Sequence, residues 1–202
     1  YHQINTKYNA LFYAQENLNE GIKKIEQTHV DNYQEILKLY KIGDLKSSQS
    51  FQSFFDQAIE KSTMAIQKHS MDINGEEKNK LIDQAYLTIG VAKFYKQDYL
   101  PAINTFNYLI RQSTDPEVQS LAVLWIGRCY LQMENQESLE STIEKINSDY
   151  TLTEIQKSIF FEIKSELEIM RQDFESAKIQ LQSVIKTTRS KTIKTRAHYI
   201  LG

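Results

Sequence analysis

Glycine, proline and cysteine are scarce in this chain of 202 residues, which has six Gly, two Pro and one Cys. Sandwiches and barrels need Gly and Pro in their many tight turns, so this scarcity argues against an all-β fold. A single Cys excludes an internal disulfide framework. No apolar run approaches the roughly 20 residues of a membrane-spanning helix.

What is present favours helices. Hydrophobic residues make up 41% of the chain, which is enough for a sizeable core, and Gln, Lys, Glu, Leu and Ile fill segments of helical length. The formal net charge of -2 gives no electrostatic reason to bind nucleic acid. The composition therefore predicts an all-α globular protein that does not bind nucleic acid.

The stretch IGVAKFYKQDYLPAINTF, residues 89–106, predicts a helical hairpin, because apolar residues recur at helical spacing on both sides of KQD. We expect Asp98 to cap the second helix with its side chain, and Pro101 to lie in the first turn of that helix, where a missing N–H costs nothing. Gly90 and Ala102 would let the two helices approach closely. That contact explains a Gly inside a helix, which costs about 1 kcal/mol of helix propensity.

The same pattern recurs along the chain. The pair Ile89-Gly90 recurs as Ile126-Gly127, and the Asp98 helix pattern recurs from Asp173, at about twice that interval. The spacing of the hairpin residues resembles the tetratricopeptide repeat, whose period is about 34 residues. The spacing consists of an aromatic residue, a Gly four positions later, an Ala twelve positions after the Gly and a second aromatic residue four positions after the Ala. The interval here is slightly longer, so we expect longer loops than usual. Two departures are Lys93, where an aromatic is usual, and the expected helix over 153–171, whose apolar face is one residue out of register.

The fold expected from this resemblance is a right-handed α-solenoid of tetratricopeptide-like helical hairpins over residues 78–202. Residues 1–77 are expected to form looser amino-terminal helical hairpins, with a first hairpin over 8–29, a helix over 53–70 and a linker at 71–80. Because a solenoid needs a polar terminal cap and the last residues resemble the start of another repeat, we expect the chain to be truncated inside that repeat and to belong to a longer protein.

Three ordered stretches carry a narrower resemblance: YHQINTKYNALFYAQENLNEGI, DNYQEILKLYKIGD and FDQAIEKSTMAIQKHSM. They resemble the amino-terminal region of the SprE/PorW family, the tetratricopeptide lipoproteins of bacterial type IX secretion and gliding motility. The resemblance implies a periplasmic, non-enzymatic scaffold whose partners are other proteins of a membrane-associated secretion complex. It also implies an outer-membrane lipoprotein, held to the membrane only through a lipid-bearing Cys that would precede Tyr1.

Motifs for catalysis or cofactors are missing: there is no phosphate loop, dinucleotide fingerprint, Cys pair or zincin motif. Glu26 and His29 have the spacing of a metal-ligand pair, but such sites need a second copy on a facing helix, so a surface pair is favoured. The stretch 70–75 partly imitates a calcium loop, yet Leu81 stands where the bidentate Glu belongs, which favours an Asn-Gly turn. The sequence predicts no enzyme, no cofactor and no metal site.

Two further features have structural interpretations. Cys129 recurs one period after Ala92, so we expect a buried structural thiol rather than a nucleophile. The basic run RSKTIKTR, residues 189–196, is favoured as a solvated loop, with contact to phosphate or to an acidic partner as the alternative.

The inner face of the first helices is the expected binding groove, since tetratricopeptide arrays present that face to peptides or helices. It is apolar and aromatic with one Arg, as protein hot spots are. Its predicted residues are Leu87, Val91, Phe94, Tyr95, Leu124, Arg128 and Leu131. An alternative stays open, in which the amino-terminal helices fold back, fill the groove and make these residues core.

Three classes of function remain. An interaction scaffold is favoured, followed by a regulatory repeat domain that binds a peptide or other ligand in its concave groove. An all-α toroidal enzyme with catalytic carboxylates is least favoured, because the acidic pairs Glu76 and Glu77, or Glu134 and Glu137, occupy ordinary loop and capping positions.

Overall fold

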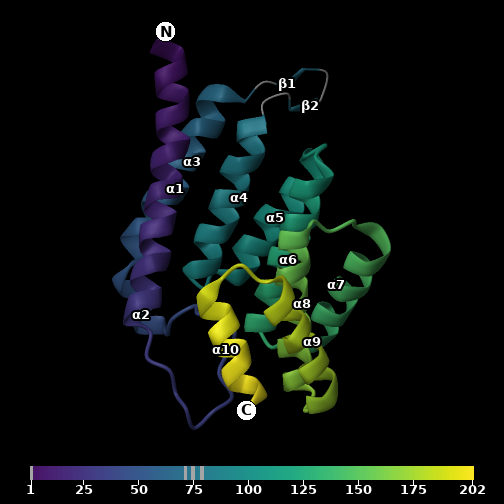
Figure 1. The fold of residues 1–202 in the computed structure, drawn as a ribbon. Coiled ribbons are helices and arrows are strands. Elements are labelled where there is room, and N and C mark those ends of the chain that lie inside the picture. Colours follow the sequence, from purple (N-terminus) through teal and green to yellow (C-terminus); the bar gives the residue numbers. More distant parts are fainter. Residues whose placement is uncertain (1, 71, 74–75, 78–79) are drawn as a thin grey trace. The chain divides into compact units, whose positions relative to one another are not determined.

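The structure, a computed structural model, describes residues 2–70, 72–73, 76–77 and 80–202 (Figure 1). It is all-α apart from one short hairpin, as the composition predicted. The helices are α1 (His2–Thr28), α2 (Leu45–Ser50), α3 (Gln52–His69), α4 (Lys80–Tyr95), α5 (Tyr99–Gln112), α6 (Pro116–Gln132), α7 (Gln136–Asp149), α8 (Glu154–Met170), α9 (Phe174–Thr187) and α10 (Lys191–Leu201). None of the described helices is both long and apolar enough to cross a membrane.

The chain forms two compact units. Unit 1 runs up to His29 and from Ile42 to Ala122, and unit 2 comprises Val30–Lys41 and Val123–Gly202. Successive helices pack in order within each unit: α3 on α4 and α4 on α5 in the first, and α7 on α8, α8 on α9 and α9 on α10 in the second. The division expected between positions 77 and 78 follows a change of sequence pattern, whereas the units follow packing, which joins α1 and α3 to α4.

One type of turn recurs between the paired helices. A residue with positive φ follows α4, α6 and α8, and its N–H bonds to the carbonyl three residues earlier, while the next N–H bonds to the carbonyl five residues earlier. This pattern is the Schellman motif, here with a side chain where Gly is usual. The positive-φ residues are Gln97 (64°), Glu134 (53°) and Gln172 (61°), which follow one another at nearly equal intervals. The predicted helical hairpins and their regular spacing are confirmed.

The residue after each of these turns is the N-cap of the next helix. Asn135 accepts a hydrogen bond from the Ser138 N–H, and Asp173 accepts one from the Ser176 N–H. Asp98 occupies the same position but makes no side-chain cap bond, so the prediction that its side chain caps α5 was wrong. Its carboxylate lies 3.8 Å from Lys96 Nζ instead.

Gly90 lies at a close contact between α4 and α5, as predicted. A Cβ built at this position would lie 2.4 Å from the ring of Phe106, so the residue that needs the space is Phe106 and not Ala102. At Gly127, one period later, a Cβ would meet Ile163 at 3.4 Å and Leu139 at 3.8 Å, which are ordinary contact distances. Close packing therefore requires Gly in the first hairpin, at Gly90, but not in the next, at Gly127.

Of two predictions for the amino-terminal part of the chain, one is confirmed and one is wrong. The helix expected over 53–70 is confirmed as α3, but the hairpin expected over 8–29 is wrong, because α1 is one continuous helix. Gly21 lies inside α1, where a Cβ would come within 2.8 Å of the Phe55 ring. Phe12, expected to face the second arm of that hairpin, is 59% exposed.

The linker expected at 71–80 contains the strands β1 (Asp72–Ile73) and β2 (Glu76–Glu77). They pair antiparallel, with Asp72 opposite Glu77 and Ile73 opposite Glu76. The Asn-Gly turn predicted at positions 74 and 75 lies outside the described residues.

The helix predicted over 153–171 is confirmed as α8. Thr153 and Gln156 form a capping box at its amino end, with each side chain accepting a hydrogen bond from the other residue's backbone N–H. Three residues of its predicted apolar face, Phe160, Ile163 and Leu167, are buried, and Met170 is 37% exposed. This helix supplies two of the charged side chains of the site described next.

Candidate functional site

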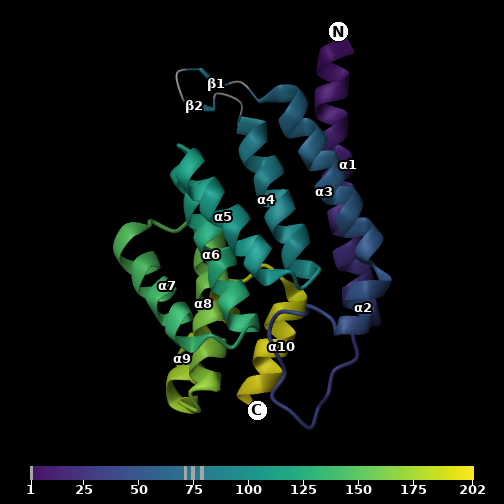
Figure 2. The same cartoon turned by 180° about the vertical axis from the view of Figure 1, so that it is seen from behind.

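An irregular segment of unit 2 runs between α1 and α2 and lies beside α10 in both views (Figure 2). We call Val30–Lys41 the docked segment. Much of it is exposed, but Leu37 and Leu39 are buried, and Asp31 and Tyr40 are half-buried. Charged residues from three helices of the same unit contact it, so it is the strongest candidate for a functional site.

Arg196 of α10 holds both ends of the docked segment. Its Nη1 donates to Asp31 Oδ1 at 2.7 Å and to Asp31 Oδ2 at 2.9 Å, and its Nε donates to the backbone carbonyl of Lys38 at 2.7 Å. Arg196 is only 6% exposed. Its buried guanidinium is therefore compensated by a carboxylate and a carbonyl of the docked segment, as buried charges require.

Glu166 of α8 binds the backbone of the docked segment. Its Oε1 accepts the Leu39 N–H at 2.8 Å. Burial raises the pKa of Glu166, and backbone hydrogen bonds from Leu39 and Tyr40 oppose that rise. This carboxyl group thus gives the segment an acceptor that does not depend on the identity of the side chains bound.

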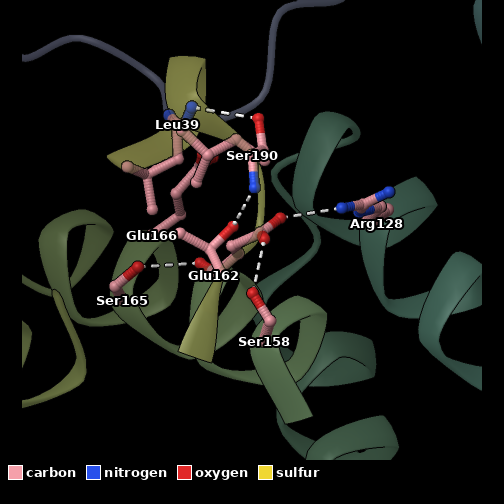
Figure 3. Close-up of polar contacts among 9 residues, drawn as sticks. Leu39, Arg128, Ser158, Glu162, Ser165, Glu166 and Ser190 are labelled. Carbon is pink, nitrogen blue, oxygen red and sulfur yellow. Dashed lines mark hydrogen bonds and ion pairs between the residues drawn. The ribbon is translucent and has the colours of Figure 1, made fainter. Parts of the chain in front are cut away.

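Arg128 of α6 lies under the aromatic end of the segment. Its guanidinium carbon is 3.8 Å from the centre of the Tyr40 ring, and its Nη2 donates to Glu162 Oε2 at 2.8 Å. Glu162 also accepts a hydrogen bond from the Ser158 hydroxyl at 3.3 Å (Figure 3). The Tyr40 ring packs edge-on against Trp125 with a centroid distance of 6.2 Å. Tyr40 is thereby bound through a cation–π contact on an arginine that the ion pair orients.

Leu39 inserts into the core of unit 2. It is 1% exposed and forms one apolar cluster with Leu181 and Val184 of α9 and Ala197 of α10. Full burial of a Leu side chain contributes roughly 1.5–3 kcal/mol. This residue is the main apolar anchor of the docked segment.

A cavity of about 560 Å³ opens beside the first half of the segment. Tyr33 and Tyr199 form an edge-on ring pair in its lining, with centroids 5.4 Å apart. The other lining residues are Gln34, Glu35, Ile36, Leu37, Ile169, Phe174, Ala177, Lys178, Leu181 and Ile200. The cavity is mainly apolar and holds no arrangement of groups suited to catalysis.

The predicted groove residues of unit 1 are largely buried. Val91, Phe94 and Tyr95 are at most 7% exposed, and Leu87 is half-buried. The Tyr95 ring stacks on Phe55 of α3 with a centroid distance of 5.6 Å. Within this unit, an amino-terminal helix covers part of the predicted face, which is the alternative left open above.

The predicted groove residues of unit 2, Leu124, Arg128 and Leu131, are also buried. An internal segment rather than a helix lies on Arg128. Whether any of the seven residues contacts a partner stays a prediction.

Sequence reasoning missed Asp31, Glu166 and Arg196 as a set. Glu162 and Glu166 stand four residues apart on α8, each next to a residue of its apolar face, Ile163 and Leu167, and this was the available signal. The basic run 189–196 was interpreted as a solvated loop, which is wrong: Ser190 caps α10 and Arg196 is buried in that helix. The alternative of an acidic partner is realised within the chain, by Asp31.

Reactive chemistry has little support among the described residues. Burial raises the pKa of Cys129 to about 12, so its thiol stays protonated and is a poor nucleophile at neutral pH. Among the residues that the structure describes, no three His, Cys, Asp or Glu side chains are grouped closely enough to hold a metal ion.

No protein-family model matches this chain, and comparison with curated proteins finds no match to its sequence. The resemblance noted above therefore rests on the three quoted stretches alone.

Proposed function

We propose that this chain is a non-enzymatic protein-interaction scaffold, a right-handed solenoid of tetratricopeptide-like hairpins that serves in the periplasm as part of the type IX secretion and gliding machinery. The main support for the scaffold function is the turn repeated at Gln97, Glu134 and Gln172. This turn joins paired helices at a nearly constant period. Arrays of this kind act by presenting surfaces to other proteins. The machinery and the lipid anchor are supported by the family resemblance only.

The buried charges also favour a scaffold over an enzyme. Arg128 pairs with Glu162, Arg196 pairs with Asp31, and Glu166 accepts a backbone N–H. Each of these groups is used in holding the chain together, whereas a catalytic acid or base needs access to a substrate.

Chemical crosslinking followed by affinity capture tests this function. A tagged full-length protein is crosslinked in the envelope of its native host, and the captured proteins are identified by mass spectrometry. We expect secretion and gliding components to be enriched over an untagged control. A double variant, Tyr33→Ser with Tyr199→Ser, removes the exposed ring pair and tests the cavity face; Leu100→Ser, at an exposed site in α5, is its control.

Capture of the same components by the Leu100→Ser variant and their loss from the double variant would assign the contact to the cavity face. Absence of every secretion component from the wild-type sample would refute the assignment to this machinery. A reproducible set of unrelated partners would support the scaffold function but refute its assignment to the type IX machinery.

A second candidate function is a regulatory repeat domain that binds a peptide. The docked segment favours it, because unit 2 already holds one irregular stretch of polypeptide through side-chain and backbone contacts.

A further inference from the structure

The docked segment is long and sparsely attached. No helix or strand is assigned between His29 and Asp44, and connections longer than about 12 to 15 residues without regular structure are uncommon unless they are functional or disordered. Val30, Asn32, Gln34 and Lys38 are exposed. The segment is held at Asp31, at the Lys38 carbonyl and at Leu39 and Tyr40, and not by a continuous ladder of backbone bonds.

These contacts resemble those that bind a separate peptide. Glu166 and the Arg196 Nε bind backbone groups, which any sequence offers. Specificity comes from side chains: a carboxylate on Arg196, an aliphatic group in the α9 and α10 cluster, and an aromatic ring on Arg128. Peptide-binding domains divide affinity and specificity between backbone and pockets in the same way.

We propose that the docked segment is an internal, exchangeable ligand, and that its site in unit 2 binds an extended peptide of a partner protein. The partner peptide carries a carboxylate eight residues before an aliphatic residue, which an aromatic residue follows, as Asp31, Leu39 and Tyr40 do. Arg196 selects the carboxylate and Arg128 selects the aromatic ring, whereas Glu166 binds the peptide backbone. This inference deepens the second candidate function and rests on it.

Exchange requires competition with a tethered ligand. A segment joined to its own site has an effective concentration on the order of millimolar, so a free peptide competes poorly until the segment is weakened or the partner adds contacts elsewhere. The apparent affinity is the intrinsic affinity multiplied by the fraction of molecules whose site is open. Weakening the docked segment without changing its site should therefore raise the affinity for an added peptide.

A peptide-binding assay tests this directly. The probe is a fluorescent peptide with the sequence of residues 30–41, VDNYQEILKLYK, titrated with the full chain. The loosened variant combines Asp31→Ala with Leu39→Ala; its control combines Val30→Ala with Gln34→Ala at exposed positions of the same segment. We expect the loosened variant to bind the probe at least tenfold more tightly than the wild type and the control do, with one peptide per chain.

Site specificity is tested in the loosened background. Adding Arg196→Gln should weaken probe binding at least tenfold, as should a probe with Asn in place of its Asp. Circular dichroism confirms that each variant is folded. A folded loosened variant that does not bind, or equal binding to all variants, would overturn the proposal. Dimers of the loosened variant in light scattering, without probe binding, would assign the site to a second copy of this chain and also overturn it.

Hydrogen exchange on the unmodified protein covers the case in which the loosened variant does not fold. We expect the Leu39 amide to exchange through a local opening, faster than the amides in the middle of α8. Exchange of Leu39 only with global unfolding would show a fixed structural segment and reject the proposal. The peptide assay does not depend on secretion components, and envelope capture does not depend on release of the docked segment. Failure of the exchange proposal can therefore be distinguished from failure of the proposed function.

Discussion

Arg196 donates to both carboxylate oxygens of Asp31 across 165 positions of the sequence. Both side chains are largely buried, at 7% and 15% exposure. Removing one member of a buried ion pair leaves the other charge uncompensated, and this cost exceeds the net contribution of the intact pair. The contact therefore stabilises the docked segment on α10 of unit 2.

We expect Arg196→Ala to lower the free energy of unfolding by about 3 kcal/mol, because Asp31 and the Lys38 carbonyl both lose their donor. Urea denaturation followed by circular dichroism measures the change. Arg189→Ala, in the same basic run but outside the buried ion pair, is the control and should change stability by less than about 0.5 kcal/mol. Equal effects of the two substitutions would contradict the structural role of Arg196.

The two repeated glycines should respond to Ala in opposite directions. At Gly90 the new methyl group would press on the buried Phe106 ring, and such overpacking costs about 1–3 kcal/mol. At Gly127 there is room for it, so the gain in helix propensity should stabilise the chain by about 0.5–1 kcal/mol. Thermal and urea denaturation of both variants decide this, and a loss of stability at both sites would show that the second contact is also tight.

Replacing Gln172 by Gly should stabilise the protein. A left-handed conformation costs a residue with a side chain about 1–2 kcal/mol, whereas Gly adds about 0.5–1 kcal/mol of unfolded-state entropy, so the net gain is about 0.5 kcal/mol. Gln182→Gly, at an exposed position inside α9, should instead cost about 1 kcal/mol. If both variants lost the same stability, the positive φ of Gln172 would carry no strain.

Glu166 should make stability depend on pH. Because its pKa is raised in the folded state, the folded chain holds this proton more tightly than the unfolded chain. Stability should therefore fall as the pH rises from the ordinary carboxyl range to the raised pKa, and it should level off above that. The nearby Glu162 strengthens the shift and Lys38 opposes it.

Glu166→Gln keeps an oxygen for the Leu39 N–H and removes the ionisation. We expect this variant to be more stable than the wild type at about pH 8 and the difference to vanish near pH 4, as measured by urea denaturation across that range. Glu144→Gln, at an exposed position of α7, should leave the pH profile unchanged. A Gln variant that is less stable at every pH would mean that the charged form of Glu166 is favourable.

Local features were predicted correctly from the sequence where their cause is local. The helix from Thr153 to Arg171 followed from its apolar spacing, and the repeated hairpins followed from one period. The predicted hairpin over residues 8–29 was wrong, because a Gly inside such a stretch is as compatible with a turn as with a tight contact inside one continuous helix. Only the position of Phe55 distinguishes the two.

The helical class, the hairpin period and the burial of Cys129 follow from local sequence patterns, because periodicity acts between residues a few positions apart. Tertiary structure alone decided that residues 30–41 join unit 2 and that Arg196 is buried against Asp31. The pairing of distant charges depends on which surfaces meet in the folded chain, and no local pattern encodes that choice.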